Sequence, residues 1–122
     1  MRTISIIIVL LFTGILGTKT TAMDYDQPVA GVSKTDTFKV WGNCNMCKIR
    51  IEKAAKINGV SKAEWNIQTK KMTLTYDPSK VSSEDVQKKI AAVGHDTEKS
   101  TADDKAYDKL DACCKYQRKG AE

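Results

Sequence analysis

Residues 40–60 read VWGNCNMCKIRIEKAAKINGV, and the change of pattern inside this stretch decides the fold. Just before the cysteines, Phe38 and Val40 alternate with polar residues, which indicates a β-strand with one buried face. After them the apolar spacing becomes helical, at positions i, i+4 and i+7: Cys47, Ile51 and Ala54. The pair Asn58-Gly59 then favours a helix end, because both residues tolerate left-handed backbone geometry. The stretch predicts a strand, a cysteine-bearing loop and a helix.

The next residues return to the two-residue period of β-strands. Apolar residues alternate over 60–67, then again over 72–76, and Thr69-Lys70-Lys71 provides a turn between them. Asp77-Pro78 ends the second of these runs. We therefore expect a β-hairpin after the first helix.

A second helix is expected to begin after a cap at Ser82 or Ser83 and to end at Gly94. Its apolar face would be Val86, Ile90 and Val93. We expect a fourth, edge strand over Asp96 to Ser100, which completes the order βαββαβ. That order predicts the α+β class, as a ferredoxin-like sandwich: a four-stranded antiparallel sheet with two helices on one face.

The N-terminus has the layout of a signal peptide. Arg2 gives a positive start, and residues 4–16 form an apolar run of 13, short of the roughly 20 that span a bilayer. We expect cleavage after residue 22 and export to the periplasm or the extracellular space, with a retained anchor as the alternative. Cleavage would remove Arg2 and Lys19 and lower the net charge from +5 to +3. This mild charge, with lysines and acids interspersed, gives no reason to expect a nucleic-acid partner.

The predicted organisation has four parts: a signal peptide over 1–22, a flexible linker over 23–34, one folded domain over 35–101, and a charged, partly helical tail over 102–122. We expect the tail, which carries the adjacent pair Cys113 and Cys114, to lie outside the core of the domain.

Cys44 and Cys47 form a C-x-x-C pair at the loop–helix junction. The pair could be a redox dithiol, half of a zinc site, or a two-thiolate clamp for a soft metal ion. Because Cys47 would open a helix, we expect the helix N-terminus to lower its pKa. Ligation by sulfur alone selects Cu(I), Hg(II), Cd(II), Zn(II) or Ag(I) over hard ions. Met46, between the two, is either a further soft donor or an ordinary loop residue.

Four motifs, spread over residues 38–97, resemble those of one family: G-N-C-N-M-C-K at 42–48, N-G-V at 58–60, Tyr76-Asp77, and I-A-A-V-G-H at 90–95. They are similar to the heavy-metal-associated domain of copper chaperones, of metal-pumping ATPases and of the periplasmic mercury-binding protein. One departure is that Cys44 follows Gly42 after a single residue, so the usual loop methionine is absent.

The resemblance implies a metal carrier rather than an enzyme. Cys44 and Cys47 would bind the ion and pass it on by ligand exchange, with Cu(I) as the first expectation and Hg(II), Zn(II) or Cd(II) as others. The partner would be a metal-transporting membrane protein or another metal carrier.

Three further residues are possible accessory ligands. By the resemblance, His95 lies in the loop that faces the clamp, where it would be a third ligand, a tuning residue or simply a half-exposed histidine. Cys113 and Cys114 could complete a four-sulfur site, form a disulfide with the clamp, or make a separate contact. Lys48 would either offset thiolate charge or be an ordinary solvated lysine.

Two other classes compete with a metal carrier. In a thiol–disulfide oxidoreductase the aromatic Trp41 and Lys48 would flank the dithiol, but neither Pro28 nor Pro78 stands where such a fold places its active-site proline. A structural zinc module would need all four cysteines around one ion and would unfold on chelation. The sequence offers no Ser–His–acid set, carboxylate pair or phosphate-binding glycine loop.

Overall fold

The computed structural model describes residues 32–121. The expected signal peptide, residues 1–22, and all but the end of the expected linker, residues 23–34, lie outside this range. Within it, none of the helices is both long and apolar enough to cross a membrane.

The sheet has three antiparallel strands: β1 (Lys34–Lys39), β2 (Val60–Trp65) and β3 (Lys71–Tyr76), in the order β1-β3-β2. At the centre of the register, Met72 of β3 lies opposite Phe38 of β1 and Trp65 of β2. The alternation predicted from the sequence is confirmed, because one face of the sheet is buried in the core: Phe38, Ala63, Trp65, Met72, Leu74 and Tyr76.

The prediction of a fourth strand over Asp96 to Ser100 is wrong in its length. The segment pairs with the end of β1 through one isolated antiparallel bridge, Val40 with Thr97. The Thr97 N–H does not extend the ladder, because it donates to the Ser100 carbonyl at 2.7 Å and so closes a tight turn. The chain therefore leaves the sheet edge after a single bridge.

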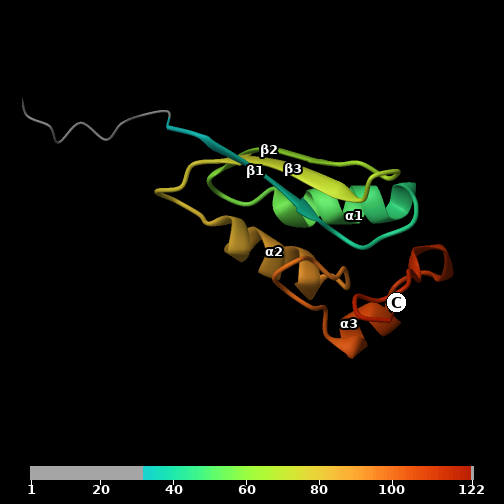
Figure 1. The fold of residues 1–122 in the computed structure, drawn as a ribbon. Helices are drawn as coiled ribbons and strands as arrows, with labels where there is room; N and C mark the ends of the chain where they lie inside the picture. Colours follow the sequence, from blue (N-terminus) through green and yellow to red (C-terminus); the bar gives the residue numbers. More distant parts are fainter. Residues whose placement is uncertain (1–31, 122) are drawn as a thin grey trace, which may run out of the picture.

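Two helices, α1 (Asn45–Ala55) and α2 (Ser83–Ala92), lie on one face of the sheet (Figure 1). α1 packs against β2 and α2, and it buries Cys47, Ile51 and Ala55. The third of these replaces the predicted Ala54, which is only half-buried. The α+β class and the order βαββα are confirmed.

The second helix begins as the sequence predicts. Ser82 caps it, and Asp85 returns the hydrogen bond in a capping box. Gly94 follows the helix with φ +102°, a conformation that favours glycine. A Cβ at Gly94 would also lie 2.8 Å from the Ala106 carbonyl oxygen and 3.0 Å from Leu110, so the tail packs directly onto this turn.

The tail belongs to the core, contrary to the expectation that it lies outside. It forms α3 (Asp104–Asp108) and the short 3₁₀ helix η1 (Ala112–Cys114), which contacts α1. In Figure 1 the tail lies beside the loop that leads into α1. Three of its side chains are buried with the core: Leu110, Cys114 and Tyr116.

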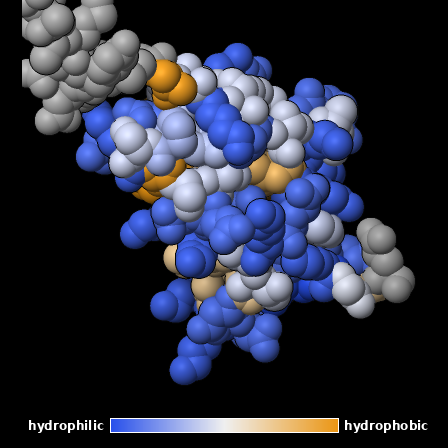
Figure 2. Space-filling model, turned by 60° about the vertical axis from the view of Figure 1, so that its left-hand side comes forward, coloured by the Kyte–Doolittle hydropathy of each residue, from blue (hydrophilic) through white to orange (hydrophobic). Residues whose placement is uncertain are grey.

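The surface is mostly polar. Figure 2 shows one face on which hydrophilic residues predominate and hydrophobic ones appear only as separate spots. Among residues 32–121, three large hydrophobic side chains are exposed: Val32, Met46 and Ile49. Two of these, Met46 and Ile49, are on the first turns of α1, next to the cysteine loop.

Candidate metal centre

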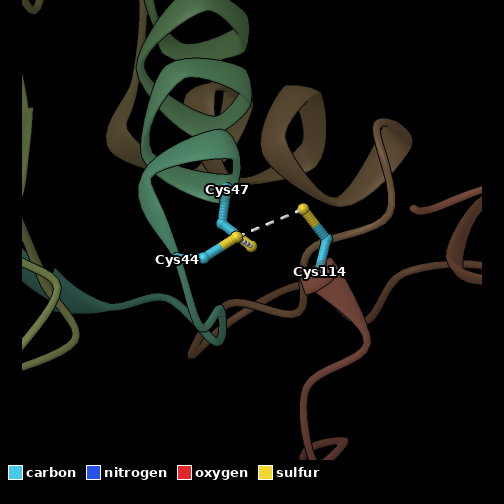
Figure 3. A group of neighbouring side chains, drawn as sticks. All are labelled: Cys44, Cys47 and Cys114. Atoms are coloured by element: carbon cyan, nitrogen blue, oxygen red, sulfur yellow. Dashed lines mark hydrogen bonds between the residues drawn. The ribbon is translucent and has the colours of Figure 1, made fainter. Parts of the chain in front are cut away.

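Cys44 and Cys47 lie at the N-terminus of α1. Cys44 is the residue before the helix, with an extended backbone, and its carbonyl accepts the Lys48 N–H at 3.0 Å. The two sulfur atoms are 3.5 Å apart (Figure 3). The Asn43 N–H points at the Cys47 sulfur from 3.4 Å. The loop and the helix start therefore direct both sulfurs to one point.

Gly42 fits the loop closely against the core. A Cβ at this position would lie 3.0 Å from the Trp65 ring and 3.2 Å from the Cys47 Cβ. Trp65 is fixed by its own hydrogen bond, from the indole N–H to the Val40 carbonyl at 3.1 Å. The loop that carries Cys44 thus has little room to shift.

Cys114 brings a third sulfur to the pair. Its Sγ is 3.6 Å from that of Cys44, and the three sulfurs of Cys44, Cys47 and Cys114 lie within 4.8 Å of one another. Figure 3 shows the Cys114 side chain pointing from the tail toward the loop–helix pair. Among the four expected sulfur ligands, the structure brings these three together and leaves Cys113 outside the group.

Cys113 faces outward although it is the neighbour of Cys114. Its side chain is exposed. Its Sγ lies 3.8 Å from the Cys114 Sγ and 3.5 Å from the Met46 Sδ. The two adjacent cysteines therefore occupy different environments, one buried in the sulfur group and one at the surface.

Hydrogen bonds on both sides of Cys114 hold the tail against the domain. The Asn43 side chain donates to the Lys115 carbonyl at 2.9 Å. The Tyr116 hydroxyl donates to the Gly94 carbonyl at 2.7 Å and accepts the Asp96 N–H at 2.8 Å. These bonds join the tail to the cysteine loop and to the segment after α2.

Arg118 of the tail pairs with Asp96, whose side chain is fully buried. Arg118 donates from Nε to one Asp96 oxygen at 2.8 Å and from Nη2 to the other at 3.1 Å, a bidentate arrangement. The same carboxylate accepts the backbone N–H groups of Ala102 and Lys119. Burial alone would raise the pKa of Asp96, but Arg118 and these bonds hold that pKa below its usual value.

The two clamp thiols have different pKa values. The pKa of Cys44 is lowered to about 7, chiefly because the Cys47 backbone N–H donates to its sulfur. Burial instead raises the pKa of Cys47 to about 11 and also raises that of Cys114. The expectation that Cys47 has the lowered pKa is therefore wrong: the residue that precedes the helix receives the N–H group, and the buried one loses solvation.

His95 lies outside the three-sulfur group. It is fully buried, with Nδ1 2.9 Å from the Trp41 carbonyl oxygen and its ring stacked on Tyr116 at 5.4 Å. Burial lowers the pKa of His95, so the ring is neutral at pH 7. The structure thus makes it neither a member of the sulfur group nor a half-exposed loop histidine.

The positive charge beside the sulfurs comes from Arg50, which sequence reasoning missed. Although burial would lower the pKa of Arg50, Cys114 is near enough for its thiol to raise that pKa. Arg50 also pairs with Asp111 at 3.3 Å, while its Nη1 is buried with no hydrogen-bond partner. Lys48 instead binds Glu52 and the Trp65 carbonyl. Helical spacing could have found Arg50, which lies one turn after Cys47, but only with the position of the tail known.

The fold and the sulfur group together define a class of protein. An α+β sandwich with a C-x-x-C pair at the junction of its first loop and first helix, and thiols gathered at one point, is a soft-metal-binding domain. The heavy-metal-associated domain profile matches residues 37–96. The chain belongs to the heavy-metal-associated domain family.

Relatives in this family handle different metals. The chain is 39% identical over 64 residues to a zinc-transporting ATPase of Synechocystis sp., and this covers 51% of the chain but only 9% of the ATPase. It is 33% identical to the mercuric transport protein periplasmic component of Pseudomonas aeruginosa, over 56% of this chain and 77% of that one. It is 39% identical to the copper chaperone CopZ of Staphylococcus epidermidis, over 48% and 90% respectively.

Solved structures agree with this assignment. A CopZ metallochaperone superposes with a TM-score of 0.51 at 30% identity, covering 52% of this chain and 98% of that one. Oxidized MerP from Ralstonia metallidurans CH34 gives a TM-score of 0.51 at 32% identity, covering 54% and 94%. Since the family profile ends at residue 96, the tail with Cys114 lies beyond the matched region.

Proposed function

We propose that this protein carries Cu(I), or a similar thiophilic ion, on the three sulfurs of Cys44, Cys47 and Cys114. One observation carries the proposal: residues 70 positions apart in the sequence place their thiols within 4.8 Å of one another at the helix start. Many specific contacts hold the tail cysteine at this point, and binding of a metal ion by all three sulfurs would explain why they exist.

The donor set favours ions that accept few sulfur ligands. Soft thiolates select Cu(I) and Hg(II), whereas Zn(II) in structural sites takes four ligands. His95, the one histidine of the chain, has its Nδ1 at the Trp41 carbonyl and is not a member of the group of ligand atoms within 4.8 Å of one another. We therefore place Cu(I) first and Hg(II) second, with Zn(II) or Cd(II) needing a further ligand from water or a partner.

Arg50 supports a thiolate at Cys114. Three thiolates around one Cu(I) ion leave a net charge of −2, and such a charge is costly in a partly buried site unless cations offset it. The Arg50 guanidinium lies beside Cys114 and keeps a buried Nη1 free of other bonds. In this proposal the deprotonated Cys114 sulfur accepts a hydrogen bond from the Arg50 Nη1.

The ion would move by ligand exchange, without catalysis by this chain. A thiolate of a membrane metal transporter or of another carrier enters the coordination shell as one of the three sulfurs leaves. If the protein is exported, as its first 22 residues suggest, the thiols must be loaded or kept reduced in an oxidising compartment.

An anaerobic competition titration with Cu(I) tests the proposal. We expect one tightly bound equivalent for the wild type and none for Cys44→Ser/Cys47→Ser. Cys114→Ser should weaken the affinity by about tenfold or more, the scale of one lost charged ligand interaction. Cys113→Ser is the matched control, one residue away and outside the group, and should keep the wild-type affinity.

Two results would count against the proposal. If Cys114→Ser binds Cu(I) as tightly as Cys113→Ser and the wild type, Cys114 is not a ligand and the site is the two-cysteine clamp alone. A wild type that binds no Cu(I) or Hg(II) tightly but exchanges disulfides with a protein substrate would favour the oxidoreductase alternative.

A further inference from the structure

Two exposed sulfur atoms lie directly outside the three-sulfur group. Met46, between the clamp cysteines, leaves 48% of its surface exposed, and the Cys113 side chain is exposed beside it. Their sulfurs are 3.5 Å apart. Since the Cys113 Sγ is also 3.8 Å from the Cys114 Sγ, the outer pair and the inner group form one continuous path of sulfur atoms.

The inner group is poorly open to solvent. Cys47 and Cys114 are fully buried, and Cys44 is half-buried. Of the three inner sulfurs, Cys44 is therefore the one that an incoming ion reaches most easily. Ligand exchange at a soft ion proceeds through a shell that contains both the old and the new donor, so a donor at the entrance lowers the barrier.

We propose that Met46 and Cys113 form the port through which the soft ion enters and leaves the site. The proposal rests on the proposed function and adds a route to it. The ion is first held by the Cys113 thiolate and the Met46 thioether, and Cys114 or Cys44 then displaces them. On release the order is reversed, and the outer pair presents the ion to the partner.

The exchange balances without any oxidant or reductant. As the ion arrives, its bonds to the donor's ligands break, the Cys113 thiol releases its proton to solvent, and bonds to the Cys113 and Met46 sulfurs form. When Cys114 takes the ion, it loses its own proton and binds the metal, the bonds to Cys113 and Met46 break, and Cys113 regains a proton. The oxidation state of the ion does not change at either step.

Kinetics separate a port from a ligand of the final site. A group that acts only along the path changes loading and release by the same factor, because the two directions share one transition state. The dissociation constant then stays the same. A group that binds the ion in the final state instead changes the dissociation constant, mostly through faster release.

The experiment uses the full chain, reduced and anaerobic, with bicinchoninate as the Cu(I) partner in both directions. Stopped-flow absorbance follows loading from the Cu(I)–bicinchoninate complex and release into excess bicinchoninate. For Met46→Leu/Cys113→Ser we expect both rates to fall by about tenfold, equivalent to about 1.4 kcal/mol of barrier, with an unchanged dissociation constant. Ile49→Leu/Ala112→Ser is the matched control, since it makes the same new residues at exposed neighbouring positions.

Each other outcome overturns the port. Unchanged rates in the double variant would show that the ion reaches the inner sulfurs without the outer pair. A larger dissociation constant, caused by faster release alone, would mean that Met46 and Cys113 are ligands of the bound ion rather than a port. A wild type without tight binding would overturn the proposed function and the port together, whereas intact binding with unchanged rates overturns the port alone.

Discussion

The contact between Asp96 and Arg118 should set how firmly the tail is attached. Asp96→Asn keeps the shape of the side chain but removes its charge and turns one acceptor into a donor that faces Arg118. The Asp96 side chain is fully buried and that of Arg118 is 22% exposed. Breaking a buried ion pair costs about 3–5 kcal/mol, and because Arg118 keeps some solvent we expect about 2–3 kcal/mol.

Urea denaturation, followed by tryptophan fluorescence, measures this loss as a fall in the free energy of unfolding. Asp104→Asn is the matched control, because Asp104 also pairs with Arg118, at 3.1 Å, but is 92% exposed. An exposed pair contributes about 0–1 kcal/mol, so the control should stay near the wild type. Equal losses in the two variants would refute the reasoning that burial and bidentate geometry make this contact dominant.

Acid should reproduce the effect of Asp96→Asn in the wild type. The pKa of Asp96 is lower in the folded protein than its usual value, so the folded state favours the carboxylate. The contribution to stability is complete above the unfolded pKa of about 3.9 and is lost as the pH falls through the folded pKa. Asp96→Asn should be less sensitive to acid in this range than the wild type.

Three other properties can be checked separately. In the metal-free protein, iodoacetamide should alkylate Cys44 first, with a midpoint near pH 7, while Cys47 reacts only at higher pH. Peptide mass spectrometry measures both reactions, and a midpoint near pH 9 for Cys44 would contradict this prediction. Because burial lowers the pKa of His95, the unfolded state takes up the proton first, so wild-type stability should fall as the pH drops below about 6.5, and His95→Gln should flatten this slope in urea titrations. Gly42→Ala places a Cβ 3.0 Å from the Trp65 ring and should cost about 1–3 kcal/mol of stability while weakening Cu(I) binding; an unchanged protein would mean that the loop moves freely.

The periodic part of the fold was predictable because each residue there carries its own signal. The alternation around Met72 and the cap at Ser82 depend on neighbours within a few positions, and the structure confirms both. The prediction of a fourth strand failed because Thr97 and Ser100 close a tight turn with three hydrogen bonds, two of them through the Thr97 hydroxyl, which propensities do not reveal.

The tail was not predictable for a different reason. The sequence predicted a partly helical tail, but it did not indicate which surface of the domain would bury Leu110 and Cys114. That surface is set by contacts between distant residues, such as Asn43 with Lys115. For the same reason sequence reasoning identified Cys44 and Cys47 as a unit but left Cys114 among several alternatives.

At the proposed site, the 70-residue separation between Cys44 and Cys114 would make a bound ion stabilise the fold as well. An ion held by both sulfurs is a reversible cross-link, and closing a loop of this length in the unfolded chain would stabilise the folded state by about 4 kcal/mol on the scale of a disulfide. Metal loading would therefore hold the tail against the domain and slow both unfolding and proteolysis of the protein. Delivery of the ion would remove this restraint, so the emptied carrier would be the more short-lived form.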